Sequence, residues 1–545
     1  MRSRILLAAI AFALLTCTLS AQSALKVPFE IDLSTGRIYV SAIVEVEGGE
    51  SSEAEWFLFD TGFTGMHVLF LTKAARRLNI PYDDSEIKKF KQANYGIKGF
   101  YPINQQVSIS LGGARFRTSE TGVILFEDDR PIFAVLKGRL VKVAGIIGLD
   151  FFKGRFIQIS YDEREITVSD ERVPLSGWLD VSAAESPDDD LLVKVHIGEE
   201  QIAAPLDSGG SGVAYLSRAT VQKYSPDTAT DDDFVFESSN RFPEMRLGDK
   251  PLSVQLIRTG KKAHIDLEHF PAVLGPLAML QFNWIIEVDK RKAYIQPRRT
   301  ATRIYQYAFP FTPLWFEFRG EGAVFSAVSL DCTRFRKAGI TEECIVLQIN
   351  GVDVRDVVEY TRDENLINQI LFRLAANPFT NTARFKLRCK DAEREVSVRL
   401  LEAHKVLDLF HLIHEKIPRS EGSEVRGRVD FSFECSETEK DRITLRLSGH
   451  GDVNPFYKVN GERIILSDAT LKVVRVFDVL AIELSIEDIL ELMYDALAQD
   501  KPFRLLCQDE SGREVLIEFD IDPTLLEAAS PAPKEPPSPD TSEKP

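Results

Sequence analysis

A pattern of residues that occurs twice between positions 25 and 300 constrains the fold more than any other feature of the sequence. In the first copy, apolar and polar residues alternate over 37–46, and an apolar run from Trp56 leads into Asp60-Thr61-Gly62-Phe63-Thr64-Gly65. In the second copy, alternation over 192–197 leads through Leu206 into Asp207-Ser208-Gly209-Gly210-Ser211-Gly212. Because alternation of this kind is typical of half-buried strands, each copy is predicted to end a β-strand in the same D-[TS]-G-x-[TS]-G loop.

The two copies also agree downstream of the loops. Ile146-Ile147-Gly148 in the first copy is matched by Val273-Leu274-Gly275 in the second. A strand, a charged turn and another strand follow each, over 156–168 and 284–295. The repeat therefore predicts a duplicated pair of β lobes.

These loops and apolar-glycine strands resemble those of the aspartic peptidase clan. The D-T-G-F-T-G loop is most similar to the bacterial retropepsin-like branch, whereas two copies in one chain resemble the duplicated, pepsin-like two-lobe arrangement. The resemblance implies an endopeptidase that cleaves peptide or unfolded protein with catalytic residues Asp60 and Asp207, without a metal or a cofactor. It also implies that Thr61 and Ser208 send their hydroxyls across to the opposite loop.

The chemistry of such a site explains the residue types in the loops. Two carboxylates about 3 Å apart cannot both ionise, so one acts as base on a water molecule while the other acts as acid on the scissile carbonyl. Gly62 and Gly209 support the loops because a Cβ would block the close approach of backbone and substrate. The residues after each D-[TS]-G, Phe63 and Gly210, cannot donate a side-chain hydrogen bond to the carboxylates. The sequence therefore predicts a raised upper apparent pKa for the pair.

A hairpin usually closes over the substrate in this clan, and the segment 94–101 is the candidate flap here. Its two glycines and its aromatic rings suit a mobile apolar lid, with Tyr95 as the predicted flap residue. Two alternatives to a working single-chain enzyme stay open. The chain could be a catalytically inactive peptide- or protein-binding protein that uses the same cleft, or two chains could pair through their first lobes.

The second half of the chain resembles a PDZ domain over one stretch. An apolar strand, a short segment ending Ala338-Gly339-Ile340, a second strand, and the turn Ile349-Asn350-Gly351 follow each other as in that family. The resemblance implies a protein partner or a peptide captured by strand addition, although Glu343-Cys344 replaces the usual Gly-Asp. Residues 403–525 contain further predicted strands and a helix from Ser485 to Leu497, and Phe503 to Asp509 echoes Phe385 to Asp391. We interpret this region as a degenerate second PDZ-like module.

The ends of the chain and its charge predict where it acts. Arg2, Arg4 and an apolar run before Ser23 have the build of a secretory signal peptide, so the protein is expected to be periplasmic or secreted. Cys17 follows Leu-Leu-Thr as in part of a lipoprotein box, which leaves a lipid anchor as an alternative. A net charge of −17 argues against a nucleic-acid partner, and no later apolar stretch has the length of a membrane span.

The sequence as a whole predicts a mainly β protein: two duplicated aspartic-protease β-barrel lobes, an α+β PDZ-like domain and a further β-rich α+β domain. The predicted segments are a signal peptide 1–23, lobe 1 at 25–176, lobe 2 at 177–299, a PDZ-like domain 302–402, a C-terminal domain 403–525 and a disordered Pro-rich tail 526–545.

Overall fold

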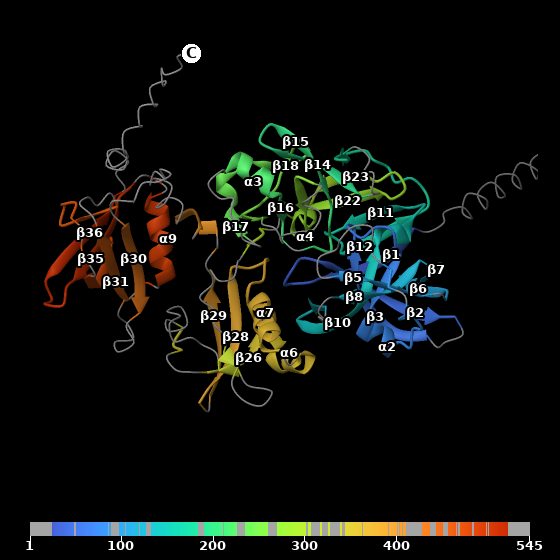
Figure 1. Cartoon of the computed structure of the whole chain (residues 1–545), viewed down its shortest axis with the longest axis horizontal. Helices are drawn as coiled ribbons and strands as arrows, with labels where there is room; N and C mark the ends of the chain where they lie inside the picture. Colours follow the sequence, from blue (N-terminus) through green and yellow to red (C-terminus); the bar gives the residue numbers. More distant parts are fainter. Residues whose placement is uncertain are drawn as a thin grey trace, which may run out of the picture. The chain divides into compact units, whose positions relative to one another are not determined.

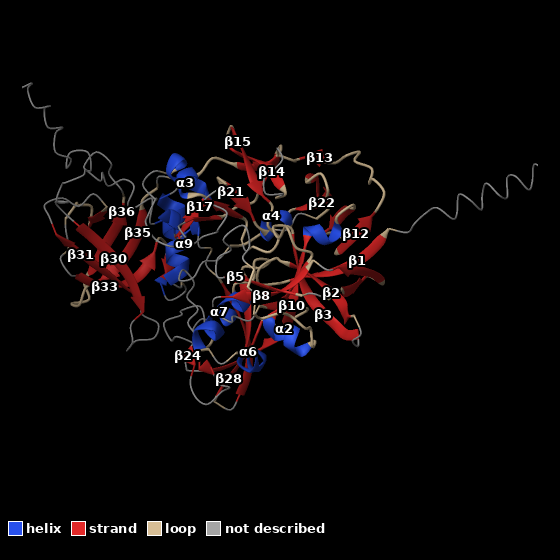
Figure 2. Ribbon diagram, turned by 45° about the vertical axis from the view of Figure 1, so that its right-hand side comes forward, coloured by secondary structure: helices blue, strands red, loops and turns tan. Residues whose placement is uncertain are grey.

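The structure is a computed structural model, and it is mainly β (Figure 2). It describes residues 24–47, 51–85, 87–88, 97–103, 105–118, 120–126, 132–183, 190–210, 212–225, 235–259, 270–300, 303–306, 317–318, 325–326, 338–340, 344–361, 363–390, 392–400, 402, 404–405, 407–409, 428–435, 443–450, 456–464, 466, 469–481, 484, 486–497, 499 and 501–520. The predicted signal peptide, Cys17, Tyr95 and the predicted Pro-rich tail lie outside the described residues. Within the described part of the chain, no helix has the length and apolar composition needed to cross a membrane.

The chain divides into two compact units (Figure 1). The first comprises Met1–Tyr305 with Asn377–Thr380, and the second comprises Gln306–Ala376 with Asn381–Pro545.

Strands of the first unit fall into two series with the same order. The first series is β1 (Leu25–Ile31), β2 (Ile38–Val46), β3 (Ser51–Asp60), β4 (Val68–Leu71), α2 (Thr72–Arg77), β5 (Ile97–Pro102), β6 (Val107–Leu111), β7 (Ala114–Thr118), β8 (Thr121–Phe126), β9 (Phe133–Leu136), β10 (Arg139–Gly148), the 3₁₀ helix η1 (Leu149–Phe152), β11 (Phe156–Ser160) and β12 (Glu165–Ser169). The second is β13 (Leu179–Asp180), β14 (Leu192–Ile197), β15 (Glu200–Pro205), β16 (Ala214–Leu216), α3 (Arg218–Tyr224), β17 (Val235–Ser238), the 3₁₀ helix η3 (Ser239–Arg241), β18 (Met245–Leu247), β19 (Lys250–Pro251), β20 (Leu256–Thr259), β21 (Ala272–Leu274), α4 (Pro276–Met279), β22 (Phe282–Glu287) and β23 (Lys292–Pro297).

The pairing of these strands repeats as well as their order. β4 lies antiparallel to β10 and parallel to β8, and β16 lies antiparallel to β21 and parallel to β20. The hairpin β2–β3 extends through β6 to β7, and the hairpin β14–β15 extends through β18 to β19. Among the described strands, β9 has no counterpart in the second series. A repeat in the sequence is therefore also a repeat in hydrogen-bonding pattern.

The two series are joined through a sheet to which both contribute. β11 pairs with β22 in antiparallel register, with Ile157 opposite Ile286. The hairpins β11–β12 and β22–β23 turn at Arg164 and Arg291, whose positive φ angles of 54° and 50° allow the tight turns that the sequence predicts there. Trp284 is fully buried in the core that both series share, so this sheet fixes one half of the unit against the other.

Strands of the second unit also form two series with one pairing order. The first is β24 (Glu317–Phe318), β25 (Phe325–Ser326), β26 (Ile345–Ile349), β27 (Val352–Asp353), α6 (Val354–Tyr360), α7 (Glu364–Ala375), β28 (Thr382–Cys389) and β29 (Ala392–Arg399). The second is β30 (Arg428–Cys435), β31 (Ile443–His450), β32 (Tyr457–Val459), β33 (Ala469–Val476), β34 (Val479–Leu480), α9 (Ile486–Leu497), β35 (Phe503–Gln508) and β36 (Glu514–Phe519). The sheets run β24-β25-β26-β28-β29 and β30-β31-β33-β35-β36, and β32 adds to the edge of the second.

Local details of this unit agree with the sequence-based expectations. The turn between β26 and β27 is made by Asn350 and Gly351, both at positive φ, as the I-N-G pattern predicts. The helix predicted from Ser485 is α9, which buries Ile489 and Met493 in the core of the second series. The cysteines of the two series differ in their bonding. Cys389 at the end of β28 forms a disulfide with Cys344, whereas Cys507 in β35 is a free thiol whose pKa burial raises to about 12.

Candidate active site

Asp60 lies at the carboxyl end of β3, and its neighbours along the strand hold it there. Phe57 and Phe59 are fully buried, so one face of β3 is anchored in the core. On one side β3 pairs antiparallel with β2, and on the other it pairs parallel with β10, which places Gly148 opposite Asp60. The apolar-glycine strand therefore lies beside the loop that carries the carboxylate.

Asp207 occupies the corresponding position in the second series. Leu206 forms a parallel bridge with Leu274, and the backbone N–H of Asp207 donates to the Leu274 carbonyl at 2.8 Å. The Asp207 residue is 8% exposed, whereas Asp60 is half-buried.

Thr61 and Ser208 cross-link the two loops through their hydroxyls. The Thr61 hydroxyl donates to the Leu206 carbonyl at 2.6 Å and accepts from the Ser208 N–H at 3.0 Å. In return, the Ser208 hydroxyl donates to the Phe59 carbonyl and accepts from the Thr61 N–H, each at 2.8 Å. Both residues are fully buried. This is the crossing that the resemblance implies, and it holds the two loops in one register.

Removing one of these hydroxyls is expected to destabilise the first unit strongly. Thr61→Val keeps the shape of the side chain but leaves the Leu206 carbonyl and the Ser208 N–H without that partner, which should cost about 2–4 kcal/mol. Thr61→Ser keeps the hydroxyl and is the matched control, with an expected loss of about 1 kcal/mol for the missing methyl group. Urea unfolding followed by tryptophan fluorescence measures both, and equal stability of the two variants would contradict the prediction.

Backbone N–H groups and the missing side chains of glycine shape the space around the carboxylates. Gly62 donates to Asp60 Oδ1 at 2.9 Å, and Gly209 and Gly210 donate to Asp207 Oδ1 at 2.9 and 2.8 Å. A Cβ on Gly209 would lie 2.1 Å from Asp60 Oδ2, and a Cβ on Gly62 would lie 3.0 Å from Asp207 Oδ1. Each loop thus reaches the carboxylate of the other; a side chain at Gly209 would displace Asp60, whereas one at Gly62 would make only a tight contact with Asp207.

The two carboxyl groups interact directly. Burial, the negative charge of Asp207 and a hydrogen bond with the Asp207 side chain raise the pKa of Asp60 to about 8, against the opposing effects of the Gly62 N–H and Arg37. Burial and the nearby like charge both disfavour ionisation of the second carboxyl group. The site therefore favours a pair that shares one proton.

The residues that follow the two D-[TS]-G motifs are Phe63 and Gly210, and they make different contacts. The ring of Phe63 lies against Gly148, where a Cβ would approach it to 2.7 Å. Gly210 contributes its backbone N–H to Asp207 in place of a side-chain hydroxyl. Among the described residues, no hydroxyl group donates to Asp60.

Arg37 is a residue near the carboxylates that the sequence reasoning missed. Its Nε–H donates to the Gly210 carbonyl at 2.6 Å, across 173 residues of chain. The sequence places Arg37 at the start of a strand, and no local pattern indicates that its side chain reaches the loop of the other half.

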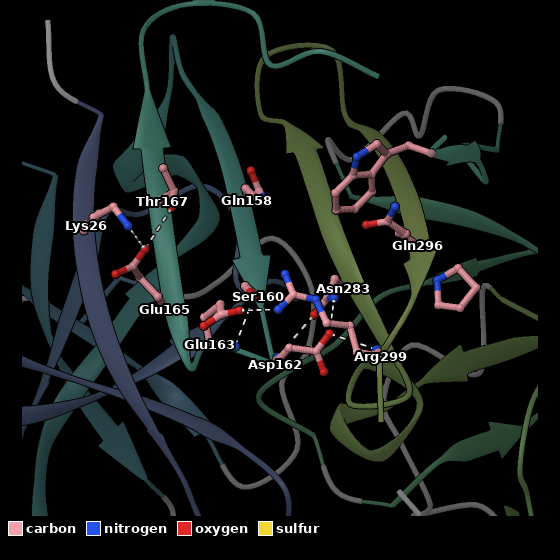
Figure 3. Close-up of a pocket in the computed structure, with 12 residues that line it drawn as sticks. Lys26, Gln158, Ser160, Asp162, Glu163, Glu165, Thr167, Asn283, Gln296 and Arg299 are labelled. Carbon is pink, nitrogen blue, oxygen red and sulfur yellow. Dashed lines mark hydrogen bonds and ion pairs between the residues drawn. The ribbon is translucent and has the colours of Figure 1, made fainter. Parts of the chain in front are cut away.

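A separate pocket of about 470 Å³ lies on the sheet that joins the two halves (Figure 3). Its lining comprises Lys26, Gln158, Ser160, Asp162, Glu163, Glu165, Thr167, Trp178, Asn283, Gln296, Pro297 and Arg299.

The carboxylates in this pocket have basic or amide partners. Glu165 pairs with Lys26 at 2.8 Å, and Glu163 pairs with Arg299 at 3.0 Å. Burial opposes ionisation of Asp162, but hydrogen bonds from the side chains of Asn283 and Arg298 and from the backbone N–H of Arg299 keep its pKa below the ordinary value. Each of these carboxylates is paired with a basic or amide side chain and not with a second carboxyl group, so the candidate active site is the pair Asp60 and Asp207.

A scan against protein-family models finds no match for this sequence, and no curated protein matches it. The functional assignment therefore rests on the residues and on their geometry.

Proposed function

We propose that the chain is an aspartic endopeptidase that hydrolyses extended peptide or unfolded protein. The observation that carries this proposal is the close approach of Asp60 and Asp207, each of which lies against the glycine of the opposite loop, in loops that donate backbone N–H groups to both carboxylates. In the proposed mechanism the ionised member of the pair takes a proton from a water molecule. The protonated member donates to the scissile carbonyl oxygen as the tetrahedral intermediate forms.

The fold that we propose rests on the repeated strand pairing. We interpret the two series of the first unit as duplicated aspartic-protease lobes, because loop, apolar-glycine strand and hairpin recur in both with the same pairing. We interpret the second unit as a PDZ-like domain followed by a degenerate copy, because the pairing order of its sheets repeats. In this proposal the PDZ-like domain engages a protein partner or presents the substrate.

The Cys344–Cys389 disulfide supports the proposed export of the chain, to the periplasm or outside the cell. Disulfides form and persist in oxidising compartments and are rare in the cytosol.

The pH dependence of hydrolysis tests the proposal. The active form needs one proton on the pair, so kcat/KM should fall where the last proton leaves. Because the pKa of Asp60 is raised to about 8, activity should persist at neutral pH and decline above about pH 8. At strongly acid pH the pair takes up a second proton and activity should fall again.

The experiment incubates the full chain with a reduced and alkylated protein at acid, neutral and alkaline pH, and maps the products by mass spectrometry. A bell-shaped profile with neutral activity is the expected result. If the chain retains the unfolded protein without cleaving it at any pH, it is a binding protein that uses the same cleft. A profile confined to strongly acid pH would contradict the raised pKa.

A further inference from the structure

The Arg37 side chain starts in the first half of the unit and ends on the loop of the second aspartate. Its Nε–H donates to the Gly210 carbonyl at 2.6 Å, and the N–H of the same Gly210 donates to Asp207 Oδ1 at 2.8 Å. The two bonds share one residue, so Arg37 is linked to the Asp207 carboxylate through the backbone of Gly210. A charged donor makes a stronger hydrogen bond than a neutral one, and it therefore restrains this loop more than a neutral side chain could.

The turn before Arg37 is held by hydrogen bonds to one buried carboxylate. The Asp32 carboxylate is buried and accepts from the Thr35 hydroxyl at 2.6 Å, from the Ser34 N–H at 2.9 Å and from the Val135 N–H at 3.1 Å. These bonds tie the turn to β9 and close it on itself.

Gly36 brings the same turn against the second half of the unit. It has φ +79°, and a Cβ there would lie 2.5 Å from Leu277 Cδ2 in α4. Glycine adopts this backbone conformation readily, and a Cβ at this position would require the Leu277 side chain to shift. Arg37 is therefore anchored on both halves, by the turn on one side and by Gly210 on the other.

Several charged or titratable groups face the Arg37 guanidinium. Burial opposes its positive charge, but the surrounding groups outweigh burial and raise the pKa of Arg37, so it stays protonated. The groups that face it are Tyr39, Asp32, Tyr215, Asp207 and Asp60. Asp32 offsets part of the positive charge, and Tyr215 in turn accepts a hydrogen bond from Arg258 Nη1 at 2.9 Å. The remaining positive charge acts on the aspartate pair, where it opposes the effects of burial and of like charge on Asp60.

We propose that Arg37 is a positioning residue of the aspartate pair, which holds the Asp207 loop through Gly210 and stabilises the singly ionised state of the pair. The reaction to which it contributes rests on the proposed function. The electrostatic role does not, because protonation of the pair can be measured without a substrate.

The first experiment compares Arg37→Met with Arg37→Lys. Methionine keeps much of the apolar stem and removes the charge, whereas lysine keeps a charge without the planar guanidinium. Loss of the charge disfavours the ionised pair, so both limbs of the kcat/KM profile of Arg37→Met should move to higher pH, by about one unit. The loss should appear in kcat more than in KM, since Arg37 is not proposed to touch the substrate. Arg37→Lys should recover at least half of the shift, and a merely structural role would instead lower activity equally at every pH.

The second experiment measures the protonation of the aspartate pair through protein stability, without any substrate. Because the pKa of Asp60 is raised in the folded state, stability is lost as pH rises from the ordinary range of an aspartate through about 8. Arg37→Met should extend this loss to higher pH in thermal unfolding, because it raises the folded-state pKa of the pair further. In an Asp60→Asn background the effect of Arg37→Met should no longer depend on pH over this range, since the pair is gone.

The outcomes separate the two proposals. A wild-type chain without peptidase activity but with this coupling refutes the proposed function and leaves the role of Arg37 standing. If the effect of Arg37→Met on stability has the same pH dependence in both backgrounds, Arg37 only braces the turn and the inference is wrong. Should Arg37→Met fail to fold, the Arg37→Gln variant serves for the same comparison, with the same expected result.

Discussion

Replacement of Asp60 or Asp207 by asparagine is expected to lower kcat/KM by at least about 10³-fold, because each variant removes one partner of the proton-sharing pair. Asparagine has the shape of aspartate and can still accept the backbone hydrogen bonds from Gly62 or from Gly209 and Gly210, so the loops should keep their conformation. Steady-state hydrolysis of a fluorogenic peptide derived from a mapped cleavage site measures the effect.

Stability provides the internal check on these variants. Ionisation of Asp60 is disfavoured in the folded state, so the wild type loses stability as pH rises toward 8 and Asp60→Asn does not. The variant should therefore gain in Tm relative to the wild type as pH rises. Asp83→Asn, at an exposed aspartate, is the matched control and should leave activity unchanged. An Asp60→Asn or Asp207→Asn variant that keeps a tenth of wild-type activity would exclude the proposed pair.

Addition of one methyl group at Gly209 is expected to lower kcat/KM by at least about 10²-fold. The new Cβ would lie 2.1 Å from Asp60 Oδ2 and 2.4 Å from Asp60 Cγ, so the carboxylate must move by about 1 Å. A displacement of that size at reacting groups costs about 10²-fold in rate. The displaced carboxylate would also lose its present contacts with the Gly62 N–H and with Asp207. The pKa of Asp60 should therefore change, and the alkaline limb of the pH profile should shift with it.

Two further substitutions serve as comparisons for Gly209→Ala. Gly62→Ala places its Cβ 3.0 Å from Asp207, so it should cost less activity than Gly209→Ala even though the two glycines hold matching positions. Gly113→Asn lies in the turn between β6 and β7, with open space around it and a positive φ that asparagine tolerates, so it should be close to neutral. Equal activities of Gly209→Ala and Gly113→Asn would show that the Asp60 carboxylate does not lie against Gly209.

The strands that carry the site could be predicted from local patterns. Alternation over 37–46 and 192–197 and the apolar run from Trp56 indicated strands, and the structure has β2, β14 and β3 there. The turns at Arg164, at Arg291 and at Asn350 also agree with the sequence, because charged or Asn-Gly turn residues between apolar runs act over a few residues. The helix predicted from Ser485 to Leu497 was indicated by its capping pattern, and the structure has α9 over Ile486–Leu497.

Other features could not be predicted because they depend on contacts between residues far apart in the chain. The disulfide partner of Cys389 lies 45 residues away, and its choice over the other cysteines depends on the register between β26 and β28. The crossing of Thr61 and Ser208 was expected from the resemblance to aspartic peptidases, but its bond lengths and complete burial follow from the packing of the two halves. Tyr95, the predicted flap residue, lies outside the described residues and stays a prediction.

By itself the sequence determined which residues could form a site: two strands, each ending in an aspartate, a hydroxyl residue and a glycine. These depend on neighbours along the chain, because burial period and turn chemistry are local properties. Only the tertiary structure decided that Arg37 reaches Gly210 and that burial and the charge of Asp207 raise the pKa of Asp60. A pKa depends on burial and on charges within a few ångströms, and pairing of the two halves brings together groups that lie more than a hundred residues apart.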